Sequence, residues 1–375
     1  MRVIVCPDKF KGSLPATEVC RAIAEGVRRV HPSAEVQSYP MADGGEGTCE
    51  LLTEWHGGKQ LEVTVHGPLF KPLTAQYGIS QDGRTAFIET AQASGLTLLS
   101  PEERNPLLTS TYGTGELIAD AIERNVRNII LGLGGSATND AGIGMASALG
   151  YVFCDVSGQP LKPVGENLIH IHHIKREGVN PQLKNVEFTA LCDVTNQLYG
   201  PEGAAYVYGP QKGAGRSAIE LLDGGLRNFR RVVHKYLKIS VDFPGAGAAG
   251  GLGAGAKVFL SANIQRGVFY LMQSWRLAEK IRKADLVITG EGKIDQQTFS
   301  GKVVSEVARV AKEEGKSVIA VCGKSDIAAQ ELRSKGVHSL ITLVDGDITE
   351  ESAMKQASTH VTEKVAAELR RLSNL

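Results

Sequence analysis

The chain has 375 residues, which is long enough for two domains that each bury a hydrophobic core of their own. Its 41 basic and 41 acidic residues give a formal net charge of zero, so composition indicates no nucleic-acid partner and no polybasic membrane contact. Glycine is in excess: 43 of the 375 residues are glycine, whereas a usual share is about 7%. The glycines follow neither the three-residue period of collagen nor the pattern of a Gly/Ser linker. These glycines therefore belong to specific loops.

The start of the chain carries no pattern of a secretion or membrane signal. Its first apolar run, residues 3–6, is shorter than the core of a signal peptide, and no stretch approaches the roughly 18 apolar residues of a membrane span. The six cysteines are scattered without a Cys-x-x-Cys pair, which indicates neither a zinc site nor a disulfide framework. We expect a cytoplasmic protein without a membrane partner, and the sequence leaves a homo-oligomer open.

Apolar runs of strand length alternate with helix-period stretches along most of the chain, which is typical of an α/β protein. The predicted strands cover residues 2–6, 35–39, 85–89, 128–133, 186–192, 285–289, 317–322 and 339–344. The predicted helices cover residues 15–30, 115–124 and 143–150, and one last long helix follows Thr349. Because several strands are continuous Val, Ile and Leu runs, we expect parallel sheets covered on both faces.

The regular alternation of strands and helices is interrupted in the middle of the chain. Residues 66–110 hold short strand-like pieces, and residues 155–185 are rich in turns, whereas the last hundred residues repeat the pattern of the first sixty. We therefore predict a discontinuous domain of residues 1–66 and 271–375, interrupted by an inserted α/β domain of residues 67–270.

Acidic and basic side chains follow four of the predicted strands. Because ligands of open α/β sheets bind at the carboxyl ends of the strands, these side chains are candidates for a binding site. They are Asp8, Lys9, Lys11, Asp43, Asp193, Glu291, Lys293 and Asp295. One such aspartate would usually just cap the next helix, but four polar strand ends favour a shared cleft for Mg²⁺ and phosphate.

The strongest single loop covers residues 132–142, between a predicted strand and a helix of small residues. Glycines let backbone N–H groups approach an anion, and the helix N-terminus adds partial positive charge. The candidate phosphate-binding residues there are Gly134, Gly135, Ser136, Ala137, Thr138, Asn139 and Asp140. Gly113, Thr114 and Gly115 open another helix, and Lys212 adds a cation among glycines. The alternative for the loop is a tight turn that only packs a helix onto the sheet.

Other motifs lead to alternative interpretations. No P-loop is present, because Val310 and Val318 stand where its first glycine is required. Residues 132–137 fit a loose dinucleotide fingerprint with Asp155 about 20 residues on, so an NAD(P)-dependent oxidoreductase is the alternative function. A third possible function is that of a non-catalytic protein that senses a ligand. The glycine run 245–255 indicates either a hinge between domains or a backbone-lined wall of the active site.

The polar loops, taken in order, resemble those of the bacterial glycerate kinase type I family over residues 1–375. The segments that carry the resemblance are PDKFKGSL, MADGGEGT, GTGELI, GLGGSATNDAGIGMASALG, LCDVTN, GAAYVYGPQKGA, PGAGAAGGLGAG and DLVITGEGKID. The resemblance implies a flavodoxin-like, doubly wound parallel-sheet domain interrupted by a second α/β domain, with the active site between them. It also implies ATP- and Mg²⁺-dependent phosphorylation of D-glycerate, mostly to 2-phosphoglycerate, with 3-phosphoglycerate as the other product.

In-line phosphoryl transfer mainly requires positioning and stabilisation of charge, which suggests roles for the candidates. The loop from Gly134 to Asp140, with the residues around Gly113 and Lys212, would hold the ATP phosphates. Substrate and phosphoryl contacts would come from Asp8, Lys9, Lys11, Glu291 and Lys293. Asp193 or Asp295 would hold Mg²⁺, and Asp43 or Asp193 would accept the hydroxyl proton.

The sequence departs from the family pattern in two loops. Gln197 replaces a proline after Asn196, and Ala141 replaces a glycine of the phosphate loop. Neither change removes an acid, a lysine or a phosphate donor.

Overall fold

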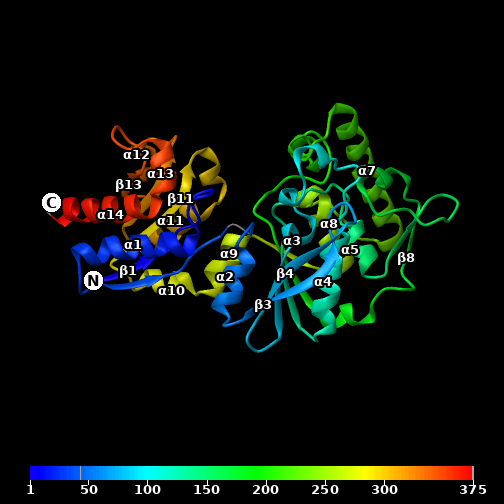
Figure 1. The fold of residues 1–375 in the computed structure, drawn as a ribbon, viewed down its shortest axis with the longest axis horizontal. Helices are drawn as coiled ribbons and strands as arrows, with labels where there is room; N and C mark the ends of the chain where they lie inside the picture. The colour runs from blue at the N-terminus through cyan, green and yellow to red at the C-terminus, as the bar shows by residue number, and fades with distance from the viewer. Residues whose placement is uncertain (43, 374–375) are drawn as a thin grey trace. The chain divides into compact units, whose positions relative to one another are not determined.

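The computed structural model describes residues 1–42 and 44–373, which divide into two compact units, described here one at a time. Unit 1 consists of residues 1–43 and 268–375, and unit 2 of residues 44–267 (Figure 1). Each unit has its own buried hydrophobic core.

Unit 1 is built on a five-stranded parallel sheet in the order β13–β12–β11–β1–β2. The strands are β1 (Arg2–Val5), β2 (Glu35–Ser38), β11 (Leu286–Ile294), β12 (Val318–Ser325) and β13 (Ser339–Thr342). Numbered along the unit alone, the order reads 2-1-3-4-5, which is the flavodoxin-like arrangement. The predicted doubly wound parallel sheet is therefore confirmed.

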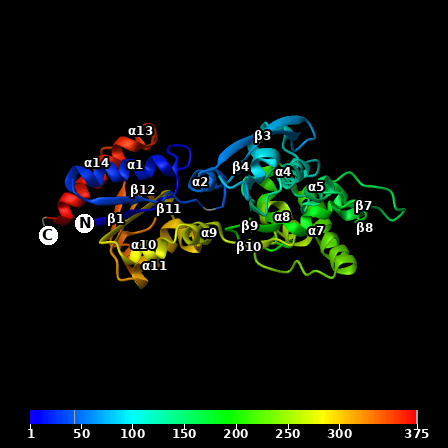
Figure 2. The same cartoon turned by 90° about the horizontal axis from the view of Figure 1, so that it is seen from below.

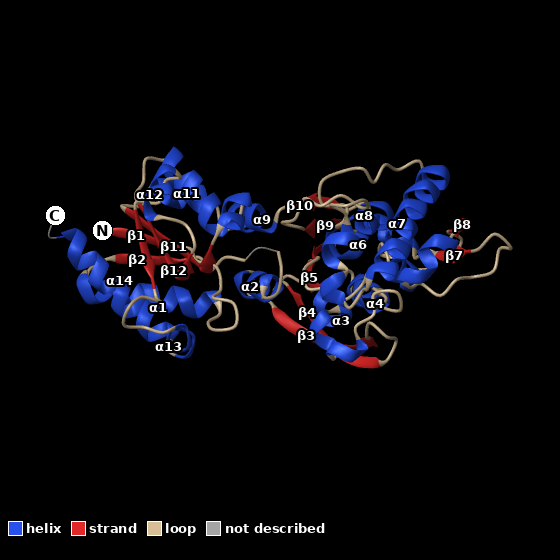
Figure 3. Ribbon diagram, turned by 90° about the horizontal axis from the view of Figure 1, so that it is seen from above, coloured by secondary structure: helices blue, strands red, loops and turns tan. Residues whose placement is uncertain are grey.

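Helices cover both faces of this sheet: α1, α13 and α14 lie on one side, and α10, α11 and α12 on the other (Figures 2 and 3). Their bounds are α1 (Ala16–Val30), α10 (Leu277–Arg282), α11 (Val303–Glu313), α12 (Ala329–Ser334), α13 (Glu350–Lys355) and α14 (Ala357–Ser373); a further helix, α9 (Gly267–Ser274), begins at the boundary between the units. In α1 the spacing of Val19, Ile23 and Val27 puts all three into the core against α14 and the sheet. The predicted last long helix is two helices, because the chain leaves helical geometry at Gln356.

Unit 2 contains a six-stranded mixed sheet in the order β10–β9–β6–β5–β4–β3, in which β4 is antiparallel to both of its neighbours. Its strands are β3 (Lys59–His66), β4 (Pro72–Ile79), β5 (Thr85–Glu89), β6 (Asn128–Gly132), β9 (Glu187–Leu191) and β10 (Asn263–Gln265); β7 (Val152–Cys154) and β8 (His173–Lys175) form a separate hairpin. Its helices are α2 (Thr48–Trp55), α3 (Thr90–Ser94), α4 (Tyr112–Glu123), α5 (Ile143–Ala148), α6 (Ala204–Tyr208), α7 (Arg216–Leu237) and α8 (Ala248–Leu260).

The first boundary between the units lies earlier than the sequence suggested. Residues 44–66 belong to unit 2, because β3 pairs with β4 along its whole length, from Lys59 opposite Ile79 to His66 opposite Pro72. The second boundary, before Val268, is within three residues of the predicted position.

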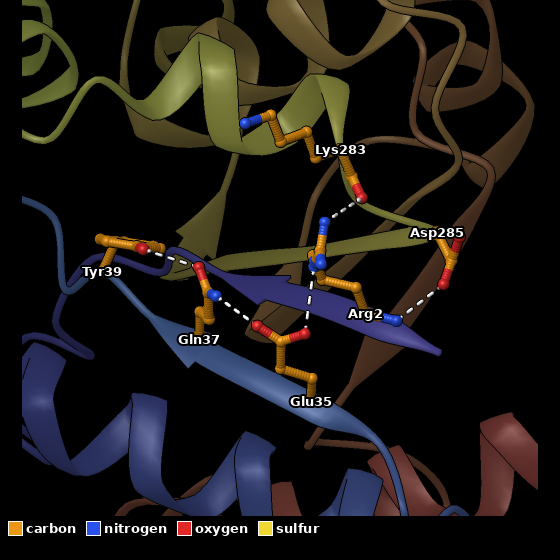
Figure 4. Close-up of polar contacts among 6 residues, drawn as sticks. All are labelled: Arg2, Glu35, Gln37, Tyr39, Lys283 and Asp285. Atoms are coloured by element: carbon orange, nitrogen blue, oxygen red, sulfur yellow. Dashed lines mark hydrogen bonds and ion pairs between the residues drawn. The ribbon is translucent and has the colours of Figure 1, made fainter.

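The amino ends of the unit 1 strands are joined by polar contacts (Figure 4). The backbone N–H of Arg2 donates to Asp285 at 2.7 Å, and its guanidinium donates to Glu35 at 3.2 Å and to the Lys283 carbonyl at 3.3 Å. Hydrogen bonds from Gln37 and Arg2 lower the pKa of Glu35. This network ties β1 to β2 and to the start of β11, so the amino end of the sheet has a structural role.

Among the described residues, no helix is both long and apolar enough to cross a membrane.

Candidate functional site

A pocket of about 470 Å³ opens at the carboxyl ends of the unit 1 strands. It lies beside β1 and β11, where the strand order of a flavodoxin-like sheet reverses and ligands usually bind. Six residues predicted from the sequence line this pocket: Asp8, Lys9, Lys11, Glu291, Lys293 and Asp295. The structure therefore brings together residues that are almost 290 positions apart in the chain.

Backbone pairing fixes the two segments that carry these side chains. After β1, the N–H of Asp8 donates to the Gly290 carbonyl at 2.8 Å, so the loop continues along the edge of β11. β11 does not end at residue 289, as the sequence suggested, because its pairing with β12 extends to Ile294. Glu291 and Lys293 are consequently strand residues two apart, which places them on one face of β11. The buried Glu291 carboxylate accepts a 2.6 Å hydrogen bond from the Thr298 hydroxyl.

The pocket collects charges of both signs. Its cations are Lys9, Lys11, Lys293, Lys302 and Lys324, and its carboxylates are Asp8, Glu291, Asp295 and Glu350. Sequence reasoning missed Lys302, Lys324 and Glu350, although Lys324 follows an apolar run as the predicted residues do. The Asp326 carboxylate lies 2.6 Å from the Lys293 ammonium and raises the pKa of that lysine above its usual value.

In unit 2, the predicted phosphate loop follows β6 and is held in a defined shape. The Ala137 N–H donates to the Ser94 carbonyl, and the Lys212 ammonium donates to Ser136 Oγ at 3.0 Å and to the Thr138 carbonyl at 2.7 Å. The backbone at Gly134 passes so close to the segment at Gly45 that a Cβ on residue 134 would lie 2.7 Å from Gly45 Cα. The backbone can make this approach only because residue 134 is glycine.

Asp140, a predicted phosphate contact, has its carboxylate already occupied. It is fully buried and accepts hydrogen bonds from the Thr111 N–H and hydroxyl, both at 2.8 Å, and from the N–H groups of Gly142 and Gly144. These donors lie at the starts of α4 and α5, so Asp140 supplies the negative charge that helix N-termini favour. Its structural role is to join the two helices to the loop.

Gly113, Thr114 and Gly115 lie in the first turn of α4 and are all buried. A Cβ at Gly113 would meet the His66 carbonyl at 1.8 Å, and one at Gly115 would meet the Met145 carbonyl at 2.3 Å. The Thr114 hydroxyl is hydrogen-bonded to Ser94. In this structure the three residues pack α4 tightly against its neighbours.

The glycine run 245–255 lies inside unit 2, which excludes a hinge between domains, one of the two alternatives that the sequence left open. Left-handed backbone at Ala249, Gly250 and Gly251 turns the chain against the phosphate loop, where the Gly250 carbonyl accepts from the Ala141 N–H at 3.0 Å. Ala141 itself has a φ of 51°, which explains why glycine suits this position in the family pattern. The run forms a backbone platform beneath the loop.

The remaining predicted acids differ in what can be described. Asp43 lies outside the described residues. Asp193 follows β9, where its Oδ2 accepts a 3.1 Å hydrogen bond from the Gly267 N–H and its Oδ1 lies 3.6 Å from Arg266 Nε. Asp193 belongs to unit 2 and Asp295 to unit 1.

The donor set for a metal is sparse. Within residues 1–42 and 44–373, no three His, Cys, Asp or Glu side chains gather as a metal site.

The dinucleotide interpretation is not supported by the topology. β7 pairs with β8 in an antiparallel hairpin outside the main sheet, so β6, α5 and β7 do not form the parallel unit that a Rossmann site needs. The Asp155 carboxylate, which would bind the ribose, accepts hydrogen bonds from Ser157 and Gln159 of its own turn.

A family model described as the glycerate kinase family matches residues 3–373. The chain belongs to the glycerate kinase family. It is 45% identical to a glycerate kinase of Halalkalibacterium halodurans over 95% of this chain and 94% of that protein, and 42% identical to a glycerate 2-kinase of Escherichia coli over 96% and 95%. A crystal structure described as glycerate kinase 2 of Salmonella typhimurium LT2 covers all of both chains with a TM-score of 0.88 and 42% identity. The predicted fold class and family are thus confirmed.

Proposed function

We propose that this chain transfers the γ-phosphoryl group of ATP to the 2-hydroxyl of D-glycerate, which gives 2-phosphoglycerate. Family membership and the similarity to a glycerate 2-kinase support the activity and this product. The observation that carries the proposal is the switch-point pocket of unit 1, in which five lysines and four carboxylates line about 470 Å³. A hydroxy acid and a phosphoryl group are small anions, which such a pocket suits.

The lysines of the pocket explain recognition of the acid. Lys11 and Lys293 are both exposed to solvent, so their ammonium groups can reach a carboxylate in the pocket. Lys9 follows β1 directly and would help to neutralise the transferring phosphoryl group. Asp8 and Glu291 would accept hydrogen bonds from the glycerate hydroxyls, which distinguish this substrate from a simple carboxylic acid.

The loop of unit 2 supplies contacts for the nucleotide. The amides of Gly134 and Gly135 donate no hydrogen bond to any residue that the structure describes, so they remain for phosphate oxygens. Ser136 adds a hydroxyl, and Lys212 adds a cation beneath the loop. Consecutive amides beside a cation are a common arrangement for binding phosphates.

Mg²⁺ would neutralise charge on the phosphate oxygens and orient them for in-line transfer. Asp295 is the better candidate ligand, because it lines the pocket with Asp8 and Glu291. Asp193 is less suited, because its carboxylate already contacts the Gly267 N–H and Arg266.

Phosphorus NMR of the product of ATP, Mg²⁺ and D-glycerate tests activity and position together. Phosphorus on the 2-hydroxyl couples to one proton and gives a doublet, whereas phosphorus on the 3-hydroxyl couples to two and gives a triplet. A doublet that grows as ADP forms supports the proposal. A triplet would move the reaction to the 3-hydroxyl, and the absence of any new ester signal would refute the kinase function.

A further inference from the structure

Lys212 is a lysine whose amine is buried inside unit 2. Its side chain lies at the end of a 3-10 helix (Pro210–Lys212) and is only 3% exposed. Among the described residues, no carboxylate forms an ion pair with its ammonium group. Charged groups without a partner are rare in protein interiors, because removing an ion from water costs on the order of several kcal/mol. An anion that binds beside the amine would stabilise its charged form.

The hydrogen bonds of the ammonium group are incomplete in the same way. It donates to Ser136 Oγ and to the Thr138 carbonyl, which uses two of its three hydrogens. A neutral amine has two N–H groups and could make both of these bonds. The third hydrogen and the positive charge are thus needed only when an anion is present.

The charged groups around Lys212 cannot serve as that anion. Asp140 acts on it electrostatically, but its carboxylate is committed to the starts of α4 and α5. Asp140 is the one charged group that shifts the pKa of Lys212 among the described residues; the neighbouring Arg104 approaches Gly213 most closely through its backbone carbonyl. Loss of water on burial, partly opposed by Asp140, lowers the pKa of Lys212 to about 7.

We propose that Lys212 takes up a proton when the phosphate chain of a nucleotide binds at the Ser136–Thr138 loop, so that nucleotide affinity falls as the pH rises above neutrality. The inference rests on the proposed nucleotide site and adds its regulation by pH. The proton comes from solvent and ends on Lys212 Nζ, which then donates its third hydrogen to a phosphate oxygen. No covalent bond to the nucleotide forms.

Isothermal titration calorimetry of the full-length protein with MgATP, without glycerate, measures the uptake of this proton directly. Titrations at pH 8.5 in buffers of different ionisation enthalpy give the number of protons taken up. We expect an uptake of about one proton per nucleotide. The affinity for MgATP should fall by up to about tenfold per pH unit between pH 7.5 and 9. At pH 6, where Lys212 already carries its proton, the uptake should largely disappear.

Two variants identify the group. Lys212→Met removes the amine but keeps the apolar stem, so it should bind MgATP more weakly and with no proton uptake at pH 8.5. Lys184→Met removes an exposed lysine elsewhere in unit 2 and should keep the wild-type uptake. Thermal unfolding confirms that both variants are folded.

The possible outcomes distinguish the role of Lys212 from the nucleotide site on which it rests. Binding of MgATP without proton uptake, or equal uptake in Lys212→Met, overturns the role of Lys212 and leaves the nucleotide site in place. No binding of MgATP by the wild-type protein refutes the nucleotide site as well.

Discussion

At the scale of single residues, the buried amine of Lys212 has a consequence for stability. Its pKa falls from 10.5 to about 7 on folding, so between these pH values the unfolded chain binds more protons than the folded one. Stability should therefore rise with pH across this window, by up to about 1.4 kcal/mol per pH unit, and this term should be flat below pH 7.

Urea unfolding at pH 6.5, 8 and 9.5 measures the effect. Lys212→Met should lose the rise while Lys184→Met keeps it. Equal pH dependence in the wild type and Lys212→Met would show that the amine is charged in the folded protein throughout this range.

A second residue-scale prediction concerns Asp193. Asp193→Asn keeps an oxygen that can accept from the Gly267 N–H, so the fold should be preserved. If the carboxylate accepts the hydroxyl proton, kcat should fall by about 10²- to 10⁴-fold, with little change in the temperature of unfolding. Steady-state kinetics and circular dichroism provide the two measurements. Near-normal turnover would leave Asp193 with only its structural contacts to Gly267 and Arg266.

The sequence predicted which polar residues come together better than it predicted their contacts. Asp8 and Lys11 line one pocket, as expected, because polar residues after a buried strand lie at the ligand-binding edge of a parallel sheet. The sequence led us to expect that Asp140 contacts phosphate. In the structure its carboxylate instead accepts hydrogen bonds from Thr111, 29 positions earlier, and nothing in the sequence reveals this contact. Long-range hydrogen bonds of this kind depend on the tertiary structure.

At the scale of elements, the phosphate loop depends on the glycine run beneath it. A Cβ at Gly250 would lie 2.0 Å from the Thr138 carbonyl, in a left-handed conformation with φ of 68°. Gly250→Ala should cost about 2–4 kcal/mol, from backbone strain and overpacking together, and should weaken MgATP binding because Thr138 must move.

Gly83→Ala is the matched control, because Gly83 has almost the same φ, 69°, with nothing near its Cβ position. It should cost about 1 kcal/mol from the conformation alone and leave nucleotide affinity unchanged. Chemical denaturation and titration of both variants with MgATP test the difference. Equal costs would mean that the platform gives way without moving the loop.

Elements were predictable where their pattern was strong. The apolar runs of β1, β5 and β6 gave bounds within one residue, because buried parallel strands are continuously apolar. β3 was not predicted, since polar, exposed residues such as Lys59, Gln60 and Glu62 interrupt its apolar pattern. The polar end of β11 was missed because its extension follows from pairing with β12, a contact that the local sequence does not show.

At the scale of the whole molecule, the two cores predict separable folding. Every residue of one core cluster lies within residues 65–262, and every residue of the other lies in unit 1. Residues 44–267 expressed alone should fold cooperatively and bind MgATP, but should not phosphorylate glycerate, because the pocket lysines are absent. Urea unfolding and calorimetry test this. An unfolded fragment would show that unit 2 depends on unit 1 for stability.

The same division sets an order for synthesis on the ribosome. The chain enters unit 2 at Gly44 and leaves it at Gly267, and these points are neighbours, since a Cβ at Gly267 would lie 2.4 Å from the Gly44 nitrogen. Unit 2 is therefore complete once residue 267 has emerged, whereas β1 still lacks β11, its partner along one edge. β1 can pair with β2 at once, but its other edge stays open until β11 (Leu286–Ile294) is made, and β12 and β13 follow later still. Nascent chains of this protein should consequently be most prone to aggregate, and to engage chaperones, during translation of that last segment.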